Sequence, residues 1–135
     1  MHTAPSGYSD IVLDHYRNPR NVGEFQDSSA TAQVGDPATG DVLRISLKIE
    51  ADTVVEARFK SFGCTAAIAV GSMTTLLVRG RRLADVEAMR NLEVIEALGG
   101  LPESKIGCSV LAEQALKEAL RRHRQAAAAQ GSPCH

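Results

Sequence analysis

The chain has 135 residues, of which 44% are hydrophobic and 23% charged, a balance typical of one globular domain and not of a disordered chain. Fifteen Lys and Arg residues oppose sixteen Asp and Glu residues, and a formal charge of −1 argues against a domain that works by neutralising many phosphates. No apolar run approaches the roughly 20 residues of a membrane span, and the opening MHTAPSGYSD has no signal-peptide pattern, so we expect a cytoplasmic protein that binds neither nucleic acid nor membrane.

The first half of the chain predicts a helix followed by strands. Tyr8, Ile11, Val12 and Tyr16 recur at helical spacing and predict an apolar stripe on a helix over residues 8–17. This helix ends before Pro19, because the residue that precedes a proline is biased away from helix, and a turn-rich connector follows. Alternating apolar residues then predict a hairpin with a turn at 51–52 and, before it, a third strand; the strands span 31–35, 42–49 and 54–60.

The second half of the chain is predicted to be helical. Residues 64–80 are apolar almost all round, which indicates a buried helix, and a short amphipathic segment follows over 83–89. We expect Asn91 to be the N-cap of the next helix, Gly99 to lie just past its end, and the last helix to run from about Gly107 to Ala129.

These elements predict an α+β fold, in which a small antiparallel sheet of about three strands is covered by one layer of helices that includes a long C-terminal helix. We expect a single domain over residues 1–135, with an ordered core at about 8–125 and flexible termini.

The three cysteines, Cys64, Cys108 and Cys134, are odd in number and widely spaced, so we expect reduced thiols and no disulfide framework. Cys64 and Cys108 each stand at the start of a predicted helix, where the helix dipole favours negative charge. This placement predicts that both thiols ionise more easily than free cysteine. Spacing alone leaves open whether they form a site or are packed as small apolar residues. Asp41 likewise either caps a turn or joins the cysteines.

Four segments carry a resemblance to a known family: DHYRNPRNVG, VGDPATGD, ARFKSFGCTAAIA and KIGCSVLAEQALKEAL, at residues 14–23, 34–41, 57–69 and 105–120. They resemble the IscU/NifU-type, SufU-related iron–sulfur cluster assembly scaffolds, from about Tyr8 to Arg124. The resemblance implies an α+β fold and a scaffold or carrier, not an enzyme. Such a protein receives sulfur from a cysteine desulfurase, combines it with iron, and passes a transient [2Fe–2S] cluster to apo-proteins.

The resemblance also implies roles for single residues. Asp41, Cys64 and Cys108 stand at the positions of metal ligands, for iron or for zinc, and Cys108 stands at the position of the sulfur acceptor. The chain departs from the family pattern at Thr39, where the first ligand cysteine is expected, and at Gly107, where a histidine is often found.

A further departure lies in the segment that some family members use to bind a chaperone. The family's Leu-Pro-Pro-Val-Lys motif is changed here at Glu103 and Ser104, so we expect weakened chaperone recognition.

A [2Fe–2S] cluster needs four protein ligands, and the family positions of one chain supply at most three. Cys134 and His135 are not expected to replace the missing ligand, because the last helix carries them away from Cys108. Three hypotheses remain open at this point. The chain is a scaffold completed from outside, for example by a homodimer; or a sulfur relay or regulator that holds metal weakly; or an interaction module without metal chemistry.

Overall fold

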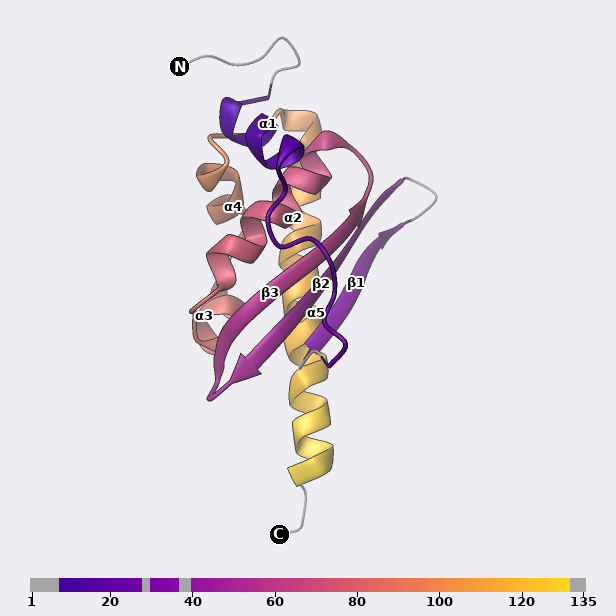
Figure 1. The fold of residues 1–135 in the computed structure, drawn as a ribbon, viewed down its shortest axis with the longest axis vertical. Helices are drawn as coiled ribbons and strands as arrows, with labels where there is room; N and C mark the ends of the chain where they lie inside the picture. Colours follow the sequence, from indigo (N-terminus) through magenta and orange to yellow (C-terminus); the bar gives the residue numbers. More distant parts are fainter. Residues whose placement is uncertain (1–7, 28–29, 37–39, 132–135) are drawn as a thin grey trace.

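The computed structural model describes residues 8–27, 30–36 and 40–131, and these residues form the predicted α+β fold (Figure 1). Three strands are followed by a run of helices, the last of which is long. In chain order the elements are α1 (Asp10–Arg17), β1 (Ala30–Asp36), β2 (Asp41–Glu50), β3 (Thr53–Phe62), α2 (Thr65–Val78), α3 (Leu83–Ala88), α4 (Asn91–Ala97), a 3-10 turn η1 (Glu103–Lys105) and α5 (Ile106–Gly131).

The three strands form one antiparallel sheet in the order β1-β2-β3, which confirms the predicted third strand. Gln33 of β1 and Lys60 of β3 lie on either side of Arg44 of β2. The β2–β3 turn places Ala51 and Asp52 at φ 52° and 60°. Two positive φ values define the tight type I′ turn that suits the twist of a hairpin, although neither residue is glycine.

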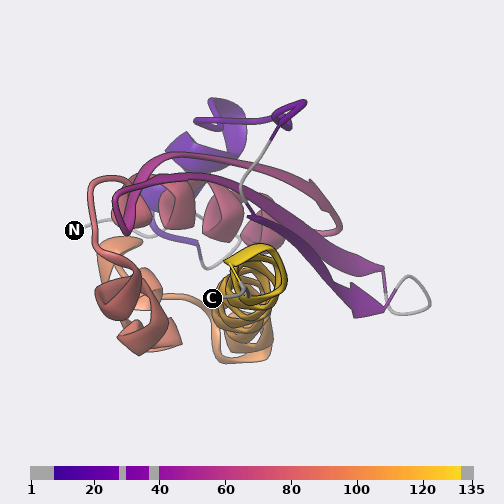
Figure 2. The same cartoon turned by 90° about the horizontal axis from the view of Figure 1, so that it is seen from below.

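Helices α2 and α5 lie against one face of the sheet, and the connector between α1 and β1 crosses the opposite face (Figure 2). The α2 helix is buried on most of its surface, as its sequence predicts. It packs closely on the sheet at Gly71, where a Cβ atom would come within 2.4 Å of the Phe59 ring. The core is built from the inner face of the sheet and these helices; its largest members include Leu43, Ile45, Leu47, Phe59, Val70, Leu98, Leu116 and Leu120.

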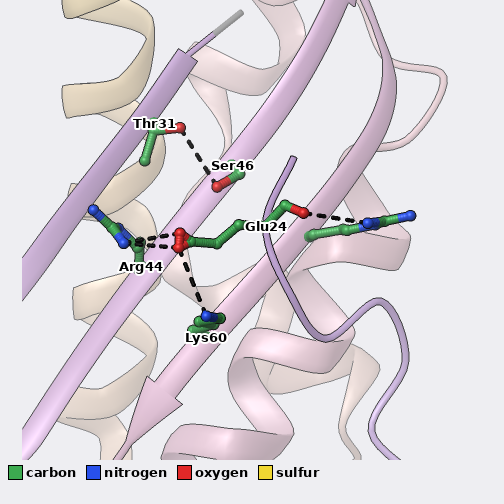
Figure 3. Close-up of polar contacts among 6 residues, drawn as sticks. Glu24, Thr31, Arg44, Ser46 and Lys60 are labelled. Carbon is green, nitrogen blue, oxygen red and sulfur yellow. Dashed lines mark hydrogen bonds and ion pairs between the residues drawn. The ribbon is translucent and has the colours of Figure 1, made fainter. Parts of the chain in front are cut away.

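The connector is held on the outer face of the sheet by charged groups. The Glu24 carboxylate accepts two hydrogen bonds from Arg44 Nη1, at 2.8 and 2.9 Å, and pairs with Lys60 at 3.7 Å (Figure 3). The cationic groups of Lys48 and Arg58 lie over the ring of Phe25, 5.0 and 4.4 Å from its centroid. The outer face is therefore covered by a connector that charged groups hold in place, and not by a second layer of helices.

The predicted stripe of α1 is only partly correct. Ile11 and Tyr16 are 38% and 43% exposed, whereas Val12 and His15 are buried. The reason is that His15 has a partner: a 2.7 Å hydrogen bond joins its Nδ1 to Ser72 Oγ on α2. A buried imidazole is tolerated where it is hydrogen-bonded, so the helix turns this face inward.

Two helix boundaries also differ from expectation. Asn91 is the first residue of α4 and not its N-cap, because α5 binds its polar groups: its N–H donates to Glu113 and its side-chain amide donates to Ser109. The last helix extends to Gly131, two residues past the expected end. Gly99 does follow the end of α4, with φ at +78°. Within the ranges described above, no helix is long and apolar enough to cross a membrane.

Candidate metal centre

The first residues of β2, α2 and α5 lie toward one end of the molecule (Figure 1). These three elements bring Asp41, Cys64 and Cys108 together. Asp41 is the first residue of β2, Cys64 is the N-cap of α2, and Cys108 lies in the first turn of α5. A ligand atom from each residue lies within 4.8 Å of the other two, and the two Sγ atoms are 3.7 Å apart. The fold therefore joins the three residues that the sequence resemblance assigned as ligands.

Gly63, the residue before Cys64, makes room for the Asp41 carboxylate. Its φ of +148° lies in a region that glycine adopts far more readily than other residues. A Cβ atom at this position would come within 2.5 Å of Asp41 Oδ1. The glycine thus allows the end of β3 to turn into α2 while the carboxylate stays beside the two thiols.

The predicted easy ionisation of Cys108 is wrong. Burial raises the pKa of the Cys108 thiol to about 12, with further contributions from the neighbouring Cys64 and Asp41, while Lys105 acts in the opposite direction. Cys108 is only 5% exposed, so its thiolate would lose most of its hydration. The helix dipole favours a thiolate at a helix start, but desolvation and the negative charges of Cys64 and Asp41 oppose it at Cys108.

Two neighbours of the site were not recognised from sequence as belonging to it. The pKa of Lys105 is raised chiefly by Cys64 and then by Tyr8, so its ammonium group is electrostatically linked to the cysteines. Burial, and after it Cys64, raises the pKa of Tyr8. Tyr8 precedes α1 and Lys105 ends η1, and only the tertiary fold brings these segments together. In the sequence, a single residue separates Lys105 from Gly107, next to Cys108. This spacing does not specify in which direction the Lys105 side chain points.

A cleft of about 380 Å³ opens beside Cys108. It gives the candidate ligands access to solvent and leaves space for an additional ligand or a transferred atom. Its lining combines residues of β1, β2, η1 and α5: Gly35, Asp41, Ser104, Lys105, Gly107, Cys108, Leu111 and Gln114.

Of the remaining predicted site positions, those that the structure describes do not add a ligand to this cluster. Gly107 has no side chain, and a Cβ atom placed on it would meet open space. Glu103 and Ser104 are exposed on η1. Thr39, together with the tail residues Cys134 and His135, lies outside the described residues.

The donor set of two thiols and one carboxylate suits a metal ion that prefers sulfur ligands. Zinc takes cysteine and carboxylate ligands in tetrahedral sites, and iron in clusters takes thiolates. Three protein ligands leave one tetrahedral position open. A bound cation would also offset the burial and like charge that disfavour the Cys108 thiolate, so metal binding should release protons.

The fold and this cluster define an α+β domain with a candidate metal site of two cysteines and one aspartate. The model of the family described as the NifU-like N terminal domain matches residues 7–130, and the chain belongs to this family.

Curated relatives agree over most of the chain. The iron–sulfur cluster assembly scaffold protein IscU of Azotobacter vinelandii is 47% identical over 121 residues, which cover 87% of this chain and 94% of the relative. The protein of the same name from Escherichia coli strain K12 is 44% identical over 117 residues, covering 84% and 91%. The crystal structure of a nitrogen-fixing NifU-like protein (N-terminal) from Brucella abortus matches with a TM-score of 0.68 at 17% identity, covers 86% of this chain and 93% of that one, and supports the fold.

Proposed function

We propose that this protein is an iron–sulfur cluster assembly scaffold that accepts sulfur from a cysteine desulfurase and holds iron or a [2Fe–2S] cluster for apo-proteins. The observation that carries the proposal is the convergence of Asp41, Cys64 and Cys108 within 4.8 Å in a chain of this family. The scaffold role is also the role that the names of its close relatives state. Because the thiols must stay reduced to bind metal, the proposal places the protein in a reducing compartment such as the cytoplasm.

Each residue has a distinct part in this proposal. Cys108 is the sulfur acceptor: the desulfurase persulfide transfers its terminal sulfur to the Cys108 thiol, which becomes a persulfide, and the desulfurase cysteine returns to a thiol. Cys64 and Asp41 then complete the iron site together with Cys108. The cleft beside Cys108 supplies the path by which sulfur and iron arrive.

The fourth ligand must come from elsewhere if the cluster is to be stable. A second copy of the chain satisfies this need if two Cys64–Cys108 pairs face one cluster, which gives four thiolates. This arrangement predicts a homodimer that forms with the cluster. Zinc is the alternative occupant, because a three-ligand site with one open position is common for zinc.

Anaerobic reconstitution tests the scaffold role. The chain is incubated with ferrous iron, cysteine and a desulfurase, and bound iron, bound sulfide and oligomeric state are measured. The proposal predicts a visible cluster at one per two chains in the wild type, its loss in Cys64→Ser and Cys108→Ser, and its retention in Cys134→Ser. Absence of iron and sulfide from the wild type contradicts it.

A sulfur relay is the second candidate, because the described residues supply only three ligand atoms. In this role Cys108 carries sulfur but the site holds iron only briefly. Thr39→Cys separates the two candidates. If the added thiol converts weak iron retention into a stable cluster, the wild-type chain is the relay; if the wild type already retains its cluster, the scaffold role stands.

The proposal also concerns the segment with which some family members bind a chaperone. Glu103 and Ser104 replace the family's residues in an exposed turn, and an acidic side chain there changes the chemistry that a chaperone groove would meet. We therefore expect a peptide of this segment to bind the chaperone less tightly than the Leu-Pro-Pro-Val-Lys sequence does.

A further inference from the structure

We propose that Cys64 releases the sulfur carried by Cys108 as sulfide, by forming a disulfide with Cys108. This inference rests on the proposed function, which supplies the Cys108 persulfide. It adds an activity to the chain: without an outside reductant, one carried sulfur atom leaves as sulfide and the site closes as a cystine.

The first observation is the contact between the two thiols. Their Sγ atoms are 3.7 Å apart, so they are already in van der Waals contact. A disulfide bond is about 2.05 Å long, and closing this gap requires a shift of under about 2 Å. Cys64 stands in extended backbone before α2, and its side chain makes no capping hydrogen bond that would have to break.

The second observation is that the cleft is lined by Cys108 and not by Cys64. Cys108 lines the cleft of about 380 Å³, whereas Cys64 is not among the residues that line it. The terminal sulfur of a Cys108 persulfide would project into the cleft. Cys64 then approaches Cys108 Sγ from a different side than the leaving sulfur, which is the arrangement that displacement at sulfur requires.

The third observation is that Cys108 has little exposed surface and lines the cleft. It is 5% exposed, and Cys64 is the other free cysteine of the described residues. A thiol from solvent must enter the cleft on the side of the terminal sulfur, where it meets that atom first. Cys64 is therefore the thiol that is placed to attack the inner sulfur.

The reaction balances within the chain. The S–H bond of Cys64 and the S–S bond of the persulfide break, and a bond forms between Cys64 Sγ and Cys108 Sγ. The terminal sulfur leaves with the proton of Cys64 as hydrogen sulfide. This sulfur is reduced to sulfide by the electrons that the cysteine sulfurs lose on becoming a disulfide. Lys105 lines the same cleft.

Whether metal is bound determines whether the carried sulfur is used for a cluster or released as sulfide. A metal ion bound by Cys64 and Cys108 occupies both sulfur atoms, so a loaded site cannot close as a disulfide. With iron present and an outside reductant supplying two electrons, the sulfur enters a cluster as sulfide. Without iron, the two cysteines supply the electrons and the same sulfur is discharged as sulfide. The disulfide form has lost two of the three ligands and binds no metal until a dithiol reductant reopens it.

The test uses the full chain with Cys134→Ser, so that only Cys64 and Cys108 carry thiols. The metal-free protein is persulfidated anaerobically with a desulfurase and cysteine, desalted, and followed by intact mass and by sulfide release. The chain with Cys64 should release sulfide in an amount equal to its bound persulfide and should lose two hydrogens relative to its reduced mass. The matched variant with Cys64→Ser should keep its extra sulfur at least about tenfold longer, because it lacks the attacking thiol. Serine is a good N-cap, so α2 should still begin at the same place.

The outcomes separate the two proposals. If the chain with Cys64 holds its extra sulfur as long as the Cys64→Ser variant does, the discharge activity is refuted while sulfur acceptance stands. If the desulfurase labels neither chain, sulfur acceptance fails. In that case persulfide is introduced with inorganic polysulfide, and the same comparison of the two release rates still decides whether Cys64 discharges it. Zinc added before the desalting step should suppress the release from the chain with Cys64, and undiminished release would contradict the competition between metal and disulfide.

Discussion

Two neighbouring residues of α2, Gly71 and Ser72, face two different kinds of interface. Gly71 lies against the Phe59 ring so closely that an added Cβ would come within 2.4 Å of it. Ser72 Oγ lies in a polar network, 2.7 Å from His15 Nδ1 and 2.9 Å from the Arg20 N–H, which donates to it. One side of the helix is therefore fixed by shape and the other by hydrogen bonds. Both sides orient the helix whose N-cap is Cys64.

Burial alone does not describe how α2, which carries Cys64 at its start, is held in place. Ser72 and His15 are as buried as the apolar core around Phe59. The apolar side should respond to added volume and not to pH. The polar side should respond to the loss of single hydrogen-bonding atoms and to protonation.

Gly71→Ala should have the largest effect. The added methyl must displace Phe59 or α2, and overpacking of this kind costs about 1–3 kcal/mol of unfolding free energy. Urea unfolding measures the loss. Gly107→Ala is the matched control, because a Cβ there meets open space and alanine favours helix, so its stability should hold or rise. Equal stability of the two variants would contradict close packing at Gly71.

Ser72→Ala should have a somewhat smaller effect, of about 1–2 kcal/mol, because it leaves buried polar groups of His15 and Arg20 without their hydroxyl partner. Chemical denaturation of the variant measures this cost. Ser104→Ala, on the exposed η1 turn, makes the same change and should be nearly neutral. A loss at Ser104 as large as at Ser72 would show that the polar network does not stabilise α2.

The polar side should also make stability depend on pH. Burial, with a smaller contribution from Arg20, lowers the pKa of His15 below its usual value of 6.5. Below that value the unfolded chain takes up a proton that the folded chain resists. Stability is therefore complete above about pH 6.5 and falls as the pH drops toward the folded pKa. His15→Gln should flatten this dependence between the two values. An unchanged slope in His15→Gln would contradict the assignment.

Ala51→Asn should have the smallest effect and the opposite sign. Ala51 adopts φ 52° in the β2–β3 turn, far along the chain from α2, and asparagine tolerates this conformation better than alanine. We expect a gain of roughly 0.5–1 kcal/mol in unfolding free energy. Thermal and urea unfolding measure it, and a loss of stability would show that the turn does not strain the hairpin.

Most of the architecture could be predicted from local sequence patterns. The alternation in 42–49 and 54–60 specifies a hairpin, and the apolar run of α2 specifies a buried helix, because these patterns record which face each element buries. The errors fall where distant groups decide. Asn91 is not an N-cap because residues of α5 bind its polar groups. Helix α1 buries His15 because Ser72 forms a hydrogen bond with it.

The candidate site shows the same division. The resemblance identified Asp41, Cys64 and Cys108, and the fold joins them. Their electrostatics could not be predicted from helix starts, because the pKa of Cys108 depends on burial and on neighbours contributed by other elements. The approach of Lys105 and Tyr8 likewise depends on how η1 and the segment before α1 pack at the same end of the sheet.

The most direct test of the account is a zinc titration of the metal-free, reduced chain, in which calorimetry measures the binding. The account predicts one zinc ion per chain, bound through Asp41, Cys64 and Cys108. Affinity should fall by about 100-fold or more in Cys64→Ser and in Cys108→Ser, because each loses a thiolate ligand, and should be unchanged in Cys134→Ser. Equal zinc affinity in the wild type, Cys64→Ser and Cys108→Ser would contradict the account.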